Sequence, residues 1–131
     1  MIIWIASYPK SGNTWIRSAL VSYFFTKDGI FNFRDLSRIP DYPSKVFLNK
    51  KTELNNLKDG DIYKYWDSSQ KEILNKKRAK FLKTHNILGS VEGLPFTKKE
   101  YTLGVIHIIR DPRNVITSIK NHLDFESYEK A

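Results

Sequence analysis

The chain has 131 residues, of which 40% are hydrophobic and 14% aromatic. This composition suffices for one buried core and excludes extensive disorder and multidomain architectures, so we expect a single domain over residues 1–131. The 22 Lys and Arg residues outnumber the 14 Asp and Glu residues, and the net charge of +8 favours anionic partners such as phosphates, sulfates or nucleic acids. The lack of cysteine excludes disulfides, thiol nucleophiles and Cys-ligated metals, and three scattered histidines argue against a structural zinc site.

The first element predicted is a strand. Residues 1–6 are apolar on both faces, as in a strand buried inside a parallel sheet. The run lacks a basic leader and is too short for a signal core or a membrane span, and no other apolar run is longer. We therefore expect a soluble, cytoplasmic protein without stable membrane insertion. A polar loop over 7–13 follows, and then apolar residues recur at helical spacing: Trp15, Ile16, Ala19, Leu20 and Tyr23.

The remainder of the chain continues this alternation. Residues 28–60 contain Pro40 and Pro43 and predict short helices and irregular connections. A helix is expected over 61–77, with Asp61 as its N-cap and a basic C-terminal end. Strands are expected over 79–84 and 103–109, because both runs have apolar centres. Asp111 and Pro112 are suited to begin a final helix, as N-cap and first helical residue.

Three strands separated or followed by helices predict an α/β fold with a parallel sheet flanked by helices. Ligands of such sheets bind beyond the carboxyl ends of the strands. Polar residues follow each predicted strand, at 10–14, at 83–85 and at Arg110. We therefore expect these three distant segments to meet at one edge of the sheet.

The loop after the first strand has the features of an anion-binding turn. Residues 9–14 offer backbone N–H groups, a glycine at Gly12 and a following helix N-terminus, and Lys10 adds a mobile positive charge. It is not a Walker A loop, because that motif has no match in the chain. The alternative is an ordinary strand-to-helix turn with Thr14 as the N-cap.

Residues 8–15 read Tyr-Pro-Lys-Ser-Gly-Asn-Thr-Trp and closely resemble the 5′-phosphosulfate-binding loop of the sulfotransferases that use 3′-phosphoadenosine 5′-phosphosulfate (PAPS). The family usually has threonine where this chain has Asn13. The resemblance implies the sulfotransferase fold related to P-loop nucleoside-triphosphate hydrolases, PAPS as the sulfuryl donor and no metal. It also implies a donor-binding site over residues 7–15, made by Lys10, Ser11, Gly12, Asn13, Thr14 and Trp15. Trp15 would stack on adenine; the alternative is core packing.

A second motif follows the strand expected over 79–84. A lone histidine after a strand is more often a surface or structural residue. However, Lys83, Thr84 and His85 resemble the Lys-Thr-His segment that carries the catalytic base of the same family. The resemblance implies that His85 takes the acceptor proton. It further implies that Lys10 stabilises the bridging oxygen, while Lys83 assists at the transferring sulfuryl group.

The third motif covers residues 109–118. Arg110 follows a strand, and Ser118 lies eight residues later, about two helical turns along. The simple alternative is a salt bridge from Arg110 to Asp111, with Ser118 as filler. The segment resembles the family's 3′-phosphate element, in which an Arg and a Ser at this separation contact the nucleotide. The resemblance therefore implies that Arg110 and Ser118 bind PAPS.

Together the three motifs imply sulfuryl transfer from PAPS to a hydroxyl or amine of a small-molecule, carbohydrate or lipid acceptor. The resemblance covers the N-terminal portion of the family's domain, so we expect a fold that is incomplete at its C-terminal end and activity that is weakened or absent. The alternatives are a P-loop-like nucleotide kinase and a non-catalytic nucleotide- or nucleic-acid-binding module; we expect no nucleic-acid partner. Three aromatic residues could line an acceptor pocket, although core packing is the better expectation: Tyr63, Tyr65 and Trp66.

Overall fold

A computed structural model describes residues 1–44, 47, 59–75 and 78–130. Its central element is a three-stranded parallel sheet in the order β2-β1-β5, and a small antiparallel hairpin, β3-β4, lies apart from it. The strands are β1 (Ile2–Ser7), β2 (Lys80–Thr84), β3 (Ser90–Val91), β4 (Leu94–Pro95) and β5 (Thr102–Ile108). The α-helices are α1 (Asn13–Phe25), α3 (Trp66–Leu74) and α4 (Pro112–Leu123), and the 3₁₀ helices are Phe33–Arg38, Asp59–Tyr65, Lys99–Tyr101 and Tyr128–Lys130.

The apolar first strand lies at the centre of the sheet, as its two apolar faces predict. In the register, Ile5 of β1 lies between Lys83 of β2 and Ile106 of β5. All three strands run in the same direction, so their carboxyl ends share one edge. The expected α/β fold with a parallel sheet flanked by helices is confirmed.

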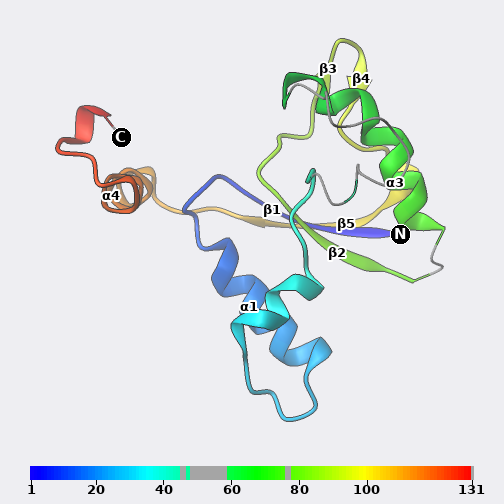
Figure 1. Ribbon diagram of the computed structural model, residues 1–131, viewed down its shortest axis with the longest axis horizontal. Helices are drawn as coiled ribbons and strands as arrows, with labels where there is room; N and C mark the ends of the chain where they lie inside the picture. The colour runs from blue at the N-terminus through cyan, green and yellow to red at the C-terminus, as the bar shows by residue number, and fades with distance from the viewer. Residues whose placement is uncertain (45–46, 48–58, 76–77, 131) are drawn as a thin grey trace.

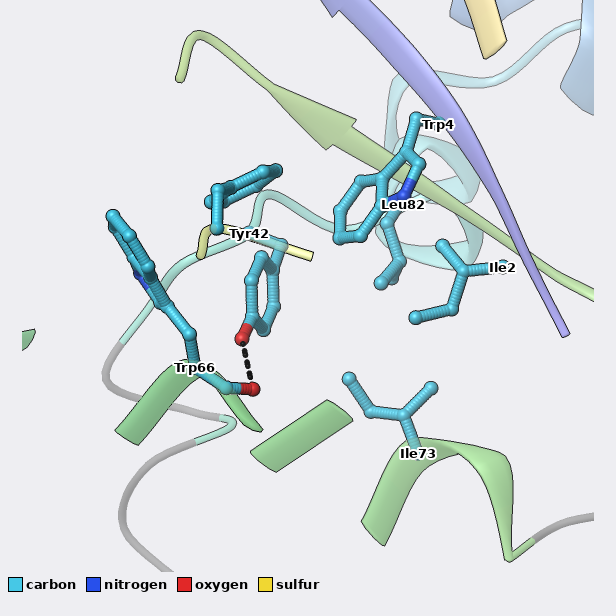
Figure 2. Packing of buried hydrophobic residues seen from close by; sticks show 7 residues of the cluster. Ile2, Trp4, Tyr42, Trp66, Ile73 and Leu82 are labelled. Carbon is cyan, nitrogen blue, oxygen red and sulfur yellow. Dashed lines mark hydrogen bonds between the residues drawn. The ribbon is translucent and has the colours of Figure 1, made fainter. Parts of the chain in front are cut away.

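Helix α3 lies on one side of the sheet and α1 on the other (Figure 1), and a cluster of buried apolar side chains lies on each face. On the α3 side, the indole of Trp4 packs 5.4 Å from the Tyr42 ring and 5.1 Å from the Phe96 ring, measured between centroids. Figure 2 shows Ile73 of α3 directed toward Ile2 and Leu82 of the sheet, and the Trp66 ring of the same helix lies 5.1 Å from the Phe96 ring. On the α1 side, a smaller cluster contains Ile5, Val21 and Ile39. The two clusters are therefore built from different parts of the chain.

Helix α1 buries a different stripe from the one that its apolar residues predict. Its buried residues are Asn13, Arg17 and Val21, spaced four apart, whereas Trp15 is 85% exposed and Tyr23 is 80% exposed. Arg17 lies inward because its Nη2 donates to the carbonyls of Leu36 and Ile39, at 3.0 Å and 2.6 Å. Polar groups with specific partners thus decide the orientation of this helix.

The helix predicted over 61–77 begins differently. Asp59–Tyr65 is a 3₁₀ helix, and α3 starts only at Trp66 without a side-chain N-cap. Asp61 is not the cap, because its Oδ1 accepts from Lys64 Nζ at 2.6 Å within the same 3₁₀ turn. Lys76 and Lys77, expected at the basic end, lie outside the described residues, as does most of the irregular segment 45–58. By contrast Asp111 caps α4 as expected, accepting from the Arg113 N–H at 2.9 Å.

A buried polar network joins α3 to the segment after the hairpin. Gln70 has no exposed surface. Its Nε2 donates to the Phe96 carbonyl at 2.6 Å, and its Oε1 accepts from the Thr97 hydroxyl at 2.7 Å. The Tyr42 hydroxyl, 2.7 Å from Ser69 Oγ, continues the network.

Gln70→Leu will therefore lower the free energy of unfolding by about 1–3 kcal/mol, because the variant leaves the buried Phe96 carbonyl without its donor. Urea denaturation measures the effect. Ser68→Ala, at an exposed position of the same helix, is the control and will change stability by less than about 0.5 kcal/mol. A Gln70→Leu protein as stable as the parent would contradict this account.

Within the described residues, no helix combines the length and the apolar character needed to cross a bilayer.

Candidate functional site

The loop between β1 and α1 forms a concave turn at the carboxyl edge of the sheet. Lys10 and Gly12 both have positive φ, 63° and 100°. An added Cβ at Gly12 would meet no atom within 4 Å, so the left-handed backbone rather than crowding favours glycine there. Gly12 is also the N-cap residue of α1 and no side chain caps this helix, so the alternative of an ordinary turn with Thr14 as the N-cap does not hold.

The backbone at the start of α1 offers N–H donors to an anion. The first N–H groups of a helix have no intrahelical partner, and their partial positive charge attracts anions. In α1 the N–H groups of Asn13 and Thr14 occupy this place, while Trp15 N–H already donates to the Gly12 carbonyl at 3.0 Å. The backbone therefore fits a phosphate or sulfate group at this point.

His85 lies against the end of β1. Its Nδ1 is 2.7 Å from the Ser7 carbonyl and 3.3 Å from Ser7 Oγ. A carbonyl only accepts hydrogen bonds, so Nδ1 carries a proton, and in the neutral ring Nε2 keeps a free lone pair. The imidazole is thus arranged as a proton acceptor at Nε2.

Arg110 reaches the loop from the end of β5. Its Nη1 donates to the Lys10 carbonyl at 2.9 Å, across 100 positions of the sequence. The salt bridge considered between Arg110 and Asp111 does not form. Asp111 instead pairs with Arg113 Nη2 at 2.6 Å, and that guanidinium lowers the pKa of Asp111. The predicted meeting of the three segments at one edge is thereby observed.

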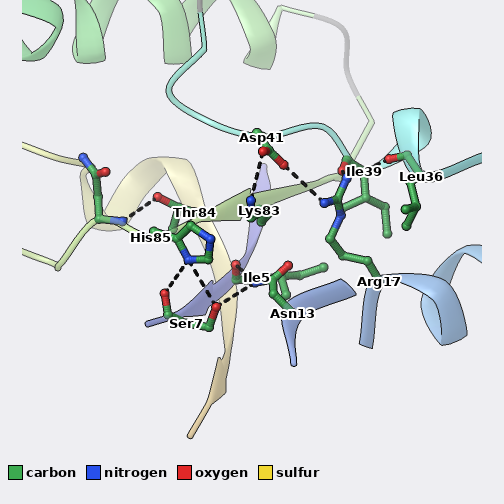
Figure 3. Close-up of polar contacts among 11 residues, drawn as sticks. Ile5, Ser7, Asn13, Arg17, Leu36, Ile39, Asp41, Lys83, Thr84 and His85 are labelled. Carbon is green, nitrogen blue, oxygen red and sulfur yellow. Dashed lines mark hydrogen bonds and ion pairs between the residues drawn. The ribbon is translucent and has the colours of Figure 1, made fainter. Parts of the chain in front are cut away.

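Lys83 is engaged by an acidic partner. Its Nζ lies 2.9 Å from Asp41 Oδ2, and Asp41 Oδ1 is 3.2 Å from Arg17 Nη1 (Figure 3). The Tyr42 N–H donates to the Lys83 carbonyl at 2.7 Å, which fixes the Asp41 segment against β2. Burial lowers the pKa of Arg17, and the charge of Asp41 opposes this shift. Asp41 therefore pairs with two positively charged side chains, those of Lys83 and Arg17, beside the edge of the sheet.

The other predicted site residues lie around the β1–α1 loop, His85 and Arg110. Ser11 is buried in the loop, and Thr14 is exposed on the first turn of α1. The exposure of Trp15 excludes core packing, the alternative to adenine stacking. Ser118 is half-buried in α4, and within the described residues no hydrogen bond joins its side chain to Arg110.

Clefts open on two sides of the site formed by the β1–α1 loop, His85 and Arg110. One of about 520 Å³ lies between the loop and α4 and is bordered by Tyr8, Ser11, Arg110 and Ile116. Two others, of about 470 and 500 Å³, both contain Asn86, the neighbour of His85. Trp66 belongs to the core and Tyr63 packs against it, as expected, and both also border the cavity of about 500 Å³.

Two residues of the site, Ser7 and Asp41, were not predicted from the sequence. Ser7 is the polar last residue of a strand, and this position could have marked it as a site residue. However, the residue type does not predict a contact with His85. Asp41 lies in a proline-rich irregular segment that offers no periodic pattern.

Within the described residues, no group of three or more His, Asp or Glu side chains could hold a metal ion.

Comparison with protein families gives one match, which covers almost the entire chain. Residues 2–129 match the sulfotransferase domain. Neither the curated proteins nor the solved structures gave a match. The three-stranded parallel sheet with its flanking helices agrees with the P-loop-like fold of that family. The chain therefore belongs to the sulfotransferase domain family.

Proposed function

We propose that this protein transfers a sulfuryl group from PAPS to a hydroxyl or amine acceptor. The observation that carries the proposal is the convergence at one sheet edge of an anion-binding loop, a histidine with a free Nε2 and an arginine on the loop backbone. We treat residues 1–131 as one domain, with the donor loop at 7–15, the Lys-Thr-His element at 83–85 and the 3′-phosphate element at 109–118.

The donor would lie across the loop. Its phosphosulfate would accept from the N–H groups at the start of α1, with Lys10 beside the bridging oxygen. Arg110 uses Nη1 for the Lys10 carbonyl, and its remaining guanidinium donors suit the 3′-phosphate. Ser118 would approach this phosphate from α4. The cleft between the loop and α4 adjoins both Ser11 and Arg110, which supports this course.

Transfer would then be an in-line displacement at sulfur. The acceptor oxygen or nitrogen attacks, its proton passes to His85 Nε2, and a new bond to sulfur forms. The bond from sulfur to the bridging oxygen breaks, and its electron pair leaves with adenosine 3′,5′-bisphosphate. Lys10 stabilises the charge on that oxygen, and Lys83 assists at the sulfuryl oxygens after exchanging its contact with Asp41. Catalysis would consist mainly of positioning and charge stabilisation.

The acceptor side would be the apolar region beyond His85. The cavities that share Asn86 open onto apolar and aromatic side chains, including Trp4, Phe96 and Trp66. This lining favours an acceptor with an apolar body that presents one hydroxyl or amine to Nε2. Naphthol, a phenol with an apolar two-ring body and one hydroxyl, is a suitable probe.

Calorimetric titration tests the donor assignment. Adenosine 3′,5′-bisphosphate will bind at least tenfold more tightly than ADP, because the 3′-phosphate adds charge-assisted hydrogen bonds to Arg110. Equal affinities, or preference for ADP, would overturn the proposal in favour of a nucleotide kinase. Binding to DNA or RNA that weakens steeply with salt and does not compete with the bisphosphate would favour the nucleic-acid module.

Trp15 provides a test of adenine stacking that is separate from folding. Because the side chain is 85% exposed, Trp15→Ala will change the free energy of unfolding by less than about 0.5 kcal/mol. The lost stacking will weaken bisphosphate binding by about 1–3 kcal/mol. Tyr23→Ala removes another exposed aromatic side chain of α1 and will leave affinity unchanged. If both variants bind equally well, Trp15 does not contact the base.

A further inference from the structure

The side chain of Asn13 is directed into the protein, toward the end of β1. Asn13 is only 6% exposed. Its Nδ2 donates to the Ile5 carbonyl at 3.2 Å and to Ser7 Oγ at 3.0 Å. The amide thus joins the first residue of α1 to the last residues of β1, and only the backbone N–H of Asn13 remains for the anion.

Ser7 continues this connection to the histidine. It is 5% exposed, and Figure 3 shows its side chain between Asn13 and His85. The Ser7 carbonyl accepts the Nδ1–H of His85 at 2.7 Å, while Oγ lies 3.3 Å from the same nitrogen. Asn13 holds Oγ, and Oγ together with the carbonyl fixes the plane of the imidazole. A continuous chain of contacts therefore runs from Asn13 through Ser7 to His85.

We propose that Asn13 and Ser7 are positioning residues that hold His85 as the Nδ1–H tautomer, so that Nε2 receives the acceptor proton. The inference rests on the proposed function for the role of His85. Asn13 serves both halves of the site, because its backbone N–H belongs to the anion-binding turn and its side chain orients the base. Donor binding and base orientation are thereby linked through one residue.

The two hydrogen bonds from Nδ2 explain why an amide suits this position. A primary amide has two N–H donors on one nitrogen, so it serves the Ile5 carbonyl and Ser7 Oγ together. A threonine hydroxyl has only one donor. Asn13→Thr removes one of these two bonds while keeping a polar side chain, and Asn13→Ala removes both.

The tautomer can be measured without any assay of activity. Nitrogen-15 NMR of the full chain, labelled at histidine, distinguishes a protonated from an unprotonated ring nitrogen. The parent protein will show His85 with Nδ1 protonated and Nε2 free while the ring is neutral. Asn13→Ala and Ser7→Ala will each shift His85 toward a mixture of tautomers, and Asn13→Thr will give a smaller shift. Asn114→Ala in α4 is the control and will leave the His85 signals unchanged.

Kinetics provide the second measurement. In Asn13→Ala, kcat for transfer to naphthol will fall roughly 10- to 100-fold, as when an orienting outer partner is lost. The affinity for adenosine 3′,5′-bisphosphate will stay within threefold, because the backbone N–H is unchanged. If both Asn13→Ala and Ser7→Ala retain the pure Nδ1–H tautomer, the positioning role is overturned. An equal loss of affinity and kcat would also overturn it, since Asn13 would then act on donor binding.

If the proposed function is wrong, two other measurements will show it. Either the parent protein will not bind adenosine 3′,5′-bisphosphate, or His85→Ala will transfer at an undiminished rate. Neither result would alter the NMR readout, which decides the tautomer on its own. If Asn13→Ala does not fold, Ser7→Ala provides the same readout, since it removes Oγ, the atom through which Asn13 is connected to His85, and leaves the backbone unchanged.

Discussion

His85→Ala will lower the rate of sulfuryl transfer to naphthol by about 10²- to 10⁴-fold, the contribution of a positioned general base. The contact of Nδ1 with the Ser7 carbonyl leaves Nε2 as the nitrogen able to take the acceptor proton. The donor site does not include the imidazole, so the affinity for adenosine 3′,5′-bisphosphate will remain within about threefold. Transfer is measured by release of the bisphosphate, and affinity by calorimetry.

His122 of α4 provides the matched control, because it is an exposed histidine outside the site. His122→Ala will transfer at the parent rate. A His85→Ala variant within a few-fold of the parent would mean that the acceptor loses its proton to water, and His85 would then serve only to join β2 to the end of β1. His85→Gln separates these roles further, since it keeps a polar side chain at this position but lacks the basic nitrogen.

The convergence of the three motifs could be predicted because it follows from strand direction. Apolar runs identified all three strands of the sheet to within one or two residues, and parallel strands bring their carboxyl ends to one edge. The contact of Arg110 with the Lys10 carbonyl is a direct result of this topology. The order and direction of the strands therefore indicate at which edge of the sheet the site lies.

The orientation of individual side chains was less accessible to sequence patterns. The apolar residues of α1 predict an inward face that includes Trp15, whereas the helix buries Asn13 and Arg17. Hydrophobic periodicity fails here because the contacts that orient the helix are hydrogen bonds to carbonyls of distant segments. The same reason explains Asp41, whose pairing with Lys83 depends on an irregular segment docking against β2.

Lys10→Ala is the second large effect expected, a fall of about 10²- to 10³-fold in kcat, as for loss of one preorganised donor to a developing oxyanion. The backbone of the loop will persist. The positive φ of Lys10 is equally costly for lysine and alanine, and Arg110 contacts the carbonyl of residue 10 rather than its side chain. The variant thus removes an ammonium group from an otherwise unchanged anion-binding turn.

This expectation distinguishes stabilisation of the leaving oxygen from simple attraction of the nucleotide. If Lys10 acts on charge that develops during transfer, kcat will fall far more than the affinity for PAPS, the ground-state donor. Lys27→Ala removes an exposed lysine beyond α1 and will leave both quantities unchanged. A loss of affinity with kcat unchanged in Lys10→Ala would restrict the ammonium to ground-state binding. In that case the charge at the bridging oxygen would have to be met by Lys83, which must first separate from Asp41.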